Sequence, residues 1–114
     1  MAINLDMECA RLGSKLSQQA NDKILTDALS VLEEQGLYAF FLYLQQKDDR
    51  KALIESCSSF LKAQVGSAID PADPLSGVRG LAKDIDRLLL ARDLLRQALV
   101  YGRYQAKARS NARS

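Results

Sequence analysis

Four basic residues in the C-terminal third of the chain are spaced to share one face of a helix. Drawn as an α-helix, the segment places Arg92, Arg96, Arg103 and Lys107 within about 60° of one another. Basic side chains along a helix can contact successive phosphates of a nucleic acid, and such binding weakens steeply as salt rises. These four residues, called here the basic stripe, are therefore a candidate site for binding an RNA backbone. The alternative is an ordinary solvated face, because basic helix faces are common.

Three further basic residues form a second, weaker candidate stripe. Arg79, Lys83 and Arg87 recur at steps of four, just before the basic stripe. Contacts of such side chains with phosphates are independent of sequence. The distribution of charge agrees with this position, since residues 1–78 carry a net charge of −4 and residues 79–114 a net charge of +6. A basic C-terminal third on an acidic body indicates an acidic partner for that third.

The residue types for other kinds of chemistry are missing or badly spaced. The chain has no histidine, which removes the commonest general base and the commonest neutral metal ligand. The two cysteines, Cys9 and Cys57, have no second pair nearby to complete a zinc site. The segment RLGSK at 11–15 lacks the two spaced glycines of a phosphate-binding loop. We therefore expect no catalytic residues, no metal, no cofactor and no small-molecule substrate.

The same composition indicates a cytoplasmic protein. Both cysteines fall on apolar faces of expected helices, which predicts buried, reduced thiols. No stretch is apolar for the roughly 18 residues of a membrane span. The N-terminus carries acids before its first base, unlike a secretory signal. We expect a cytoplasmic location without membrane contact.

Apolar periodicity predicts an all-α fold, a compact bundle of about five helices with a long C-terminal helix. The expected helices cover residues 4–19, 22–34, 37–46, 49–65 and 78–108, and the last segment is either one helix or two. Asn21 or Asp22, and Asp48 or Asp49, are expected to cap helices, and Gly36 to end one. Residues 66–77 contain both prolines and predict a loop. We expect one helical domain over residues 1–108 and a frayed basic tail over residues 109–114.

Most of the aromatic residues lie in one short segment. Four of the seven, Tyr38, Phe40, Phe41 and Tyr43, fall within six positions. A helix that is apolar nearly all round is either buried on most sides or docks against a partner. The tyrosines at 38, 43, 101 and 104 can stack on bases, as in proteins that bind single strands. The favoured interpretation is that they belong to the core, with their hydroxyl groups at its rim.

Two segments, ALSVLEEQGLYAFFLYLQ (28–45) and LLLARDLLRQALVYGRYQAKA (88–108), carry a family resemblance. The chain resembles the small, all-helical subunit of type III CRISPR effector ribonucleoproteins, in particular of the Cmr (type III-B) complex. In that family a polar residue, a glycine and a leucine precede a compact apolar helix, as in Gln35-Gly36-Leu37. The family has asparagine where this chain has Gln35. Its last helix is comparable to this chain at Ala91-Arg92 and at Tyr104-Gln105-Ala106.

The resemblance implies a role in antiviral defence without catalysis by this chain. Small subunits of the family stack into a filament and help line the groove that holds guide RNA paired with target RNA. The implied partners are other CRISPR effector subunits, copies of the chain itself, the guide RNA and the target RNA. A helical adaptor that binds only protein remains the alternative, with the basic stripe then a solvated face.

Overall fold

The computed structural model describes residues 4–66 and 69–113, and the regular elements of these residues are helical. The helices are α1 (Leu5–Gln19), α2 (Asp22–Gln35), α3 (Leu37–Leu44), α4 (Lys51–Val65), α5 (Pro74–Leu81) and α6 (Ile85–Arg113), with a short 3-10 helix over Asp48–Arg50 before α4. The structure confirms the predicted all-α bundle and its long C-terminal helix.

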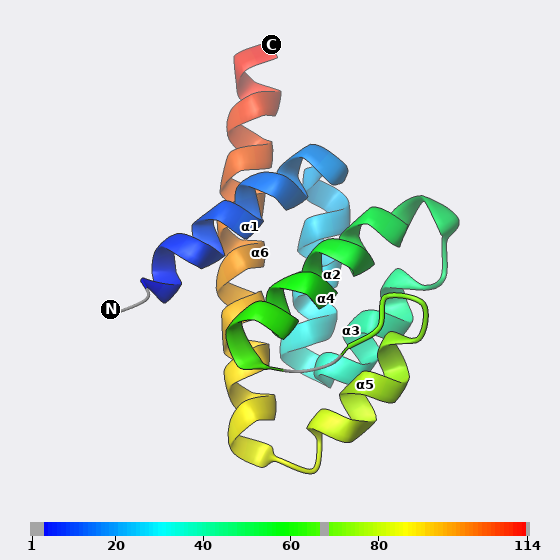
Figure 1. Cartoon of the computed structure of the whole chain (residues 1–114). Coiled ribbons are helices and arrows are strands. Elements are labelled where there is room, and N and C mark those ends of the chain that lie inside the picture. Colours follow the sequence, from blue (N-terminus) through cyan, green and yellow to red (C-terminus); the bar gives the residue numbers. More distant parts are fainter. Residues whose placement is uncertain (1–3, 67–68, 114) are drawn as a thin grey trace.

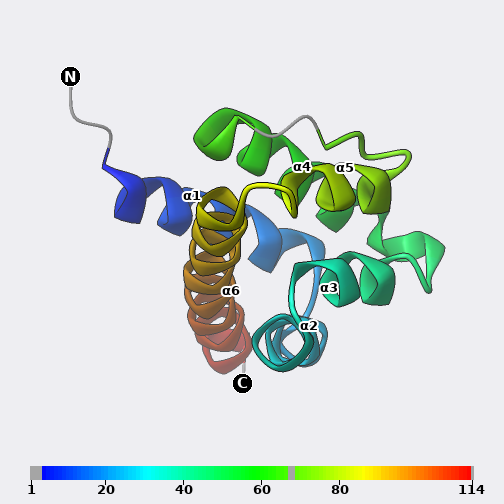
Figure 2. The ribbon, with the colours of Figure 1, turned by 90° about the horizontal axis from the view of Figure 1, so that it is seen from below.

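The long helix α6 is the element around which the others are arranged. In Figure 1 it runs through the full height of the molecule, and its C-terminal end projects beyond the remaining helices. Figure 2 shows α1 crossing α6, while α2, seen end-on, lies beside α6, which is seen obliquely along its axis. The contacts of α6 with α1 and with α2 are the most extensive between helices of the described residues. Helices α3, α4 and α5 complete the bundle (Figure 2).

One hydrophobic core joins all six helices, and the aromatic segment contributes its largest side chains. Phe40 and Phe41 are buried and meet edge to face, with ring centroids 5.2 Å apart. Tyr38 and Leu42, on the other side of α3, are 41% and 48% exposed. The segment is therefore buried in the core on one side and exposed and uncharged on the other, so the interpretation as a core helix holds for its buried side.

Two of the predicted helix boundaries are confirmed, and a third is wrong. The Asn21 side chain accepts a hydrogen bond from the Ile24 N–H at 2.9 Å and caps α2. Gly36 separates α2 from α3 with φ of 98°, a conformation that favours glycine. Neither Asp48 nor Asp49 caps α4, because both lie in the 3-10 helix and no side-chain hydrogen bond caps the first turn of α4.

A helix begins inside the loop expected over residues 66–77, and of the two alternatives for residues 78–108, one helix or two, the structure has two. α5 begins at Pro74, inside the predicted loop, because the Asp73 side chain accepts from the Ser76 N–H at 3.4 Å and proline suits a first helical turn. The chain then turns at residues 82–84, and α6 continues unbroken from Ile85 to Arg113. The helix also continues through 109–113, where we expected a frayed tail, and Ser114 lies outside the described residues.

Helices α1 and α6 cross with their backbones in contact. A Cβ atom added at Gly13 would lie 2.7 Å from the Ala98 carbonyl oxygen and 2.7 Å from the Tyr101 Cβ. A Cβ atom added at Gly102 would lie 3.2 Å from the Gly13 carbonyl oxygen. The Tyr101 hydroxyl also donates to the Asp6 carboxylate across this crossing, at 2.6 Å. Position 13 therefore has no room for a side chain.

We predict that Gly13→Ala lowers the free energy of unfolding by about 1–3 kcal/mol, because the added methyl group forces the two helices apart. Alanine is the better helix former, so helix propensity alone predicts the opposite sign. Urea unfolding followed by circular dichroism measures the change. Gly80→Ala is the matched control, since nothing lies within 4 Å of a Cβ there, and we expect equal or higher stability. An unchanged stability of Gly13→Ala would contradict the tight crossing.

Candidate nucleic-acid interface

All four residues of the basic stripe lie on α6, but the structure divides them into two pairs. Ala91, Leu95 and Ala98 form the buried side of this helix. Arg92 and Arg103 are partly buried beside α2, whereas Arg96 and Lys107 are exposed. The four residues lie on the same helix, as their spacing predicted, but two of them contact α2 and two face solvent.

Arg92 and Arg103 each contact one end of α2. The Arg92 guanidinium donates to the main-chain carbonyl of Glu33 at 2.7 Å, in the last turn of α2. Carbonyl groups there lack partners within the helix and carry partial negative charge, so a cation is favourable. At the other end, the Arg103 Nε lies 3.9 Å from the Asp22 carboxylate, and the Arg103 side chain is 32% exposed. These two arginines hold α2 against α6.

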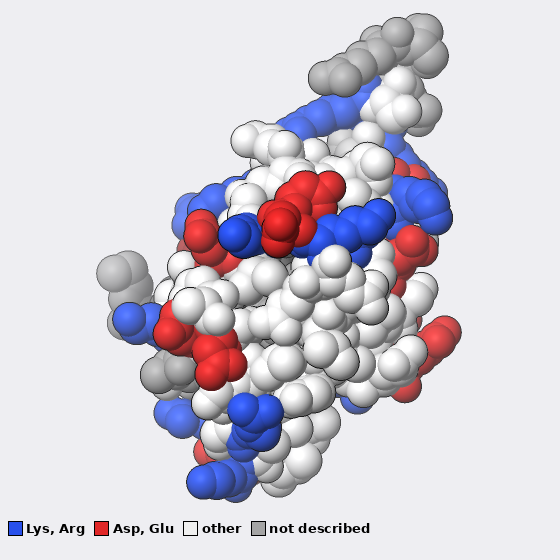
Figure 3. All heavy atoms as spheres, turned by 90° about the vertical axis from the view of Figure 1, so that its right-hand side faces the viewer, with Lys and Arg blue, Asp and Glu red and all other residues white. Residues whose placement is uncertain are grey.

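Arg96 and Lys107 differ because both are exposed and neither has a hydrogen-bond or ion-pair partner among the side chains that the structure describes. Neither forms an ion pair with an acidic side chain of the described residues. No acidic residue occurs on α6 after Asp93. Figure 3 shows Lys and Arg side chains in blue following the projecting end of the molecule at the top of the view. The part of the basic stripe available to a phosphate backbone is therefore Arg96 and Lys107.

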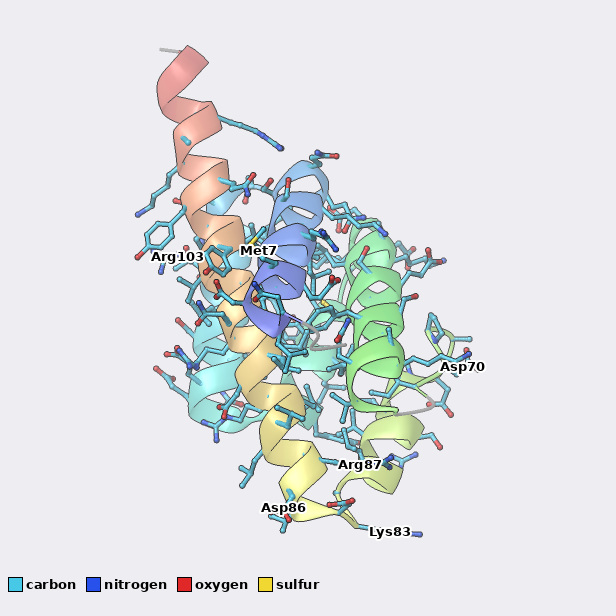
Figure 4. All side chains as sticks on the ribbon, turned by 60° about the vertical axis from the view of Figure 1, so that its left-hand side comes forward. Met7, Asp70, Lys83, Asp86, Arg87 and Arg103 are labelled. Carbon is cyan, nitrogen blue, oxygen red and sulfur yellow. The ribbon has the colours of Figure 1, made fainter. Side chains whose placement is uncertain are left out.

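The second candidate stripe does not form one helix face. Arg79 lies on α5, where its guanidinium donates to the Tyr38 hydroxyl at 3.2 Å. Lys83 is exposed in the turn between α5 and α6, and Arg87 lies on α6, 3.8 Å from the Asp84 carboxylate. Figure 4 shows Lys83 and Arg87 near the start of α6, far along the helix from Arg103. The break between α5 and α6 removes the helical spacing on which this stripe was predicted.

A cleft of about 870 Å³ beside the projecting end of α6 was not predicted from the sequence. Residues of the α1–α2 corner line one side, among them Gln18 and Lys23. Arg109 and Ser110 line the other, on a stretch that we expected to be a frayed tail. Each wall has a basic side chain, but Asp22 also lines the cleft and Lys23 lies 3.5 Å from the Asp27 carboxylate, so the lining carries mixed charge. Its two walls are distant in sequence, so no local pattern indicates it.

A buried arginine was also missed, and its role is structural. Arg50 is only 8% exposed, and its guanidinium lies 4.6 Å from the centre of the Tyr43 ring. It also donates to the Tyr43 main-chain carbonyl at 3.4 Å, near the end of α3. A cation over an aromatic face and beside helix-terminal carbonyls is stabilised by both. Arg50 therefore joins the end of α3 to the start of α4 and does not present its charge to a ligand.

The described part of the chain contains neither a candidate metal site nor a helix that could span a membrane. Within residues 4–66 and 69–113, no group of three or more His, Cys, Asp or Glu side chains could hold a metal ion. None of the helices in these residues combines the length and the apolar character needed to cross a membrane. Comparison of the chain with protein-family models, with curated proteins and with solved structures finds no match.

We predict that Arg92→Ala lowers the free energy of unfolding by about 1 kcal/mol, because the Glu33 carbonyl loses its donor. Arg96→Ala, one turn further along the same helix, should change it by less than about 0.5 kcal/mol, as is usual for an exposed surface residue. Denaturant unfolding of the two variants under identical conditions tests the difference. Equal stability of the two variants would show that the Arg92 contact with α2 contributes nothing.

Both cysteines should react slowly with thiol reagents in the folded protein. Burial raises the pKa of the Cys57 thiol to about 12. Burial also raises the pKa of Cys9, with a smaller contribution from the nearby charges of Asp6 and Glu8. The thiolate is the reactive form, and its fraction falls as the pKa rises above the working pH. Labelling at neutral pH should therefore be much faster in denaturant than in buffer, and rapid labelling of the folded chain would contradict this arrangement.

Proposed function

We propose that the chain is a non-catalytic small subunit of a type III CRISPR RNA-guided effector ribonucleoprotein, acting in antiviral defence in the cytoplasm. In this proposal it stacks with copies of itself as a filament and contacts the backbone of guide RNA paired with target RNA. The observation that carries the proposal is the C-terminal half of α6, which after Asp93 has basic but no acidic side chains and whose end projects from the bundle. Cleavage and other catalysis belong to partner subunits.

The geometry of Arg96 and Lys107 supports contact with a phosphate backbone. Both are exposed and outside the ion pairs of the described residues. They are separated by eleven helical residues, or roughly 16 Å along the axis, which is long enough to follow several phosphates. Backbone contacts carry no sequence information. A complex programmed by its guide RNA needs such contacts, because base pairing already reads the sequence.

Exposed apolar residues supply candidate surfaces for neighbouring subunits. Tyr38 and Leu42 are exposed on α3, and Ile85, Leu89 and Leu90 are 61%, 47% and 41% exposed on the first turns of α6. Figure 3 shows uncharged atoms covering the centre of one face, with Lys, Arg, Asp and Glu around it. White in this view includes polar uncharged residues, so the apolar surface is identified by the exposed side chains of α3 and α6, and exposed apolar side chains of this kind are typical of contacts between proteins.

The same surfaces favour a second candidate function, a helical adaptor that binds only protein. Under that alternative Tyr38 and Leu42 form the binding surface, and Arg96 and Lys107 are solvated. The two functions differ in one measurable respect. An RNA-contacting subunit binds RNA with a dependence on salt concentration that these two cations set, whereas an adaptor does not.

We predict that the double variant Arg96→Glu, Lys107→Glu weakens RNA binding by the assembled complex and makes it less sensitive to salt. Removing two phosphate contacts should reduce the slope of log affinity against log salt by roughly 1.8, at about 0.9 for each contact with a duplex. Binding of labelled RNA at several salt concentrations measures this slope. Lys62→Glu, an exposed lysine on α4, is the control for a general effect of charge. An unchanged slope in the double variant would refute the phosphate contact.

Purification of the tagged chain from its host tests the assembly itself. The proposal expects short RNAs that share a repeat-derived 5′ handle, together with several larger proteins. RNA sequencing and mass spectrometry of the eluted material identify both. Recovery with a single protein and without RNA would refute the effector subunit and support the adaptor.

A further inference from the structure

Tyr104 differs from the other three tyrosines of the chain in having no partner among the described residues. It is 68% exposed, more than any other large hydrophobic residue of that part of the chain. Each of the others is held by a neighbour: Tyr38 by Arg79, Tyr43 by Arg50 and Tyr101 by Asp6. The expectation that all four tyrosines belong to the core therefore does not hold for Tyr104.

The position of Tyr104 on α6 explains why its ring is uncovered. Gly102, two residues earlier, marks the crossing with α1, and beyond it the helix projects from the bundle (Figure 1). Lys107 lies one turn further along, at i+3, and Val100 one turn before, at i−4, so both are neighbours of the ring on the helix surface. The ring is presented on a rigid helix, with an apolar neighbour on one side and a cation on the other.

The surrounding charge indicates what kind of ligand can cover this ring. Arg96, Arg103 and Lys107 lie on the same half of α6, and no acidic residue of that helix follows Asp93. A ligand that satisfies both features combines negative charge with a flat, apolar face. Nucleotides have this combination, since a phosphate lies next to a base with an exposed π-face. An acidic peptide would use the cations but leave the ring without a matching surface.

We propose that Tyr104 is a stacking platform for an unpaired base of single-stranded nucleic acid, with Lys107 and Arg96 holding phosphates of the same strand. The base must be unpaired, because in a duplex its neighbours cover both faces. This inference rests on the proposed function and deepens it. It assigns to the chain a contact with a base beside the paired guide and target, in addition to contacts with the backbone.

Nuclear magnetic resonance of the full-length chain tests the stacking directly. The chain has four tyrosines, so selective labelling of tyrosine rings gives a short set of signals. Titration with single-stranded oligoadenylate should shift the ring signals of Tyr104 upfield, as stacked aromatic groups do, while those of Tyr38 and Tyr43 stay in place. This measurement remains informative at weak affinity, because it is made at high protein concentration.

Matched variants separate stacking from simple burial of an apolar group. Tyr104→Phe keeps the ring and should bind oligoadenylate as the unchanged chain does. Tyr104→Leu keeps an apolar side chain without the ring, and its affinity should fall by about tenfold, which is the usual effect of losing one stacked base. An abasic sugar-phosphate chain of the same length should bind equally to both variants, since it carries the charge and lacks the base. Fluorescence anisotropy of labelled oligonucleotides measures all three.

The results distinguish this inference from the proposed function on which it rests. If binding requires Arg96 and Lys107 but the Tyr104 signals stay in place, the stacking site is wrong and the backbone contact stands. If polyglutamate binds as tightly as oligoadenylate and Tyr104 does not respond, the surface is a general anion site, and stacking is again refuted. If the chain at high protein concentration binds no oligonucleotide at low salt, the stacking site is refuted, and the backbone contact is decided by the salt dependence of RNA binding by the assembled complex.

Discussion

The close crossing of α1 and α6 is the constraint on which the rest of the fold depends. Gly13 lets the two backbones touch at Ala98 and Gly102, where a side chain at position 13 would collide with main-chain atoms. This contact sets the distance between the first and last helices of the chain. Once α1 is fixed, the short connection through Asn21 brings α2 alongside α6. The first two helices and the last one thus form a unit against which α3 and α4 complete the core.

The placement of α2 determines which cations remain available. Its first residue, Asp22, lies near Arg103, and its last turn accepts a hydrogen bond from Arg92. Two of the four basic side chains that share a face of α6 therefore stabilise the packing of two helices. The crossing also sets where α6 leaves the bundle. Helices α1 and α2 pack against α6 up to the crossing, and the end of α6 beyond it projects from the other helices (Figure 1). What projects beyond is a helix end with basic side chains and one uncovered aromatic ring.

The sequence was a good guide to the helices and a poor guide to contacts between them. Periodic apolar residues predicted the all-α class and the approximate positions of α1 to α4, because burial of one helix face is a local pattern. Spacing also placed the basic stripe on one face of α6. It could not show that Arg92 would meet a carbonyl 59 positions earlier in the chain, since that contact follows from helix packing. Gly13 appeared only as a glycine within a helical pattern, and its importance depends on the residues that approach it.

The dipole of a long helix offers another explanation for basic residues in the C-terminal half of α6. The size and range of the dipole effect restrict this explanation to the last turns of the helix. Cations near a helix C-terminus are stabilised by about 0.3–1 kcal/mol, but the effect falls off within the last turn. Helix α6 ends at Arg113, so the helix dipole can account for a cation near its last turn, at Arg109. Arg96 lies 17 residues earlier, roughly 25 Å along the axis, where the helix terminus no longer contributes. Neither the helix dipole nor an ion pair within the described residues neutralises that exposed charge, so within the described fold Arg96 is stabilised by hydration alone.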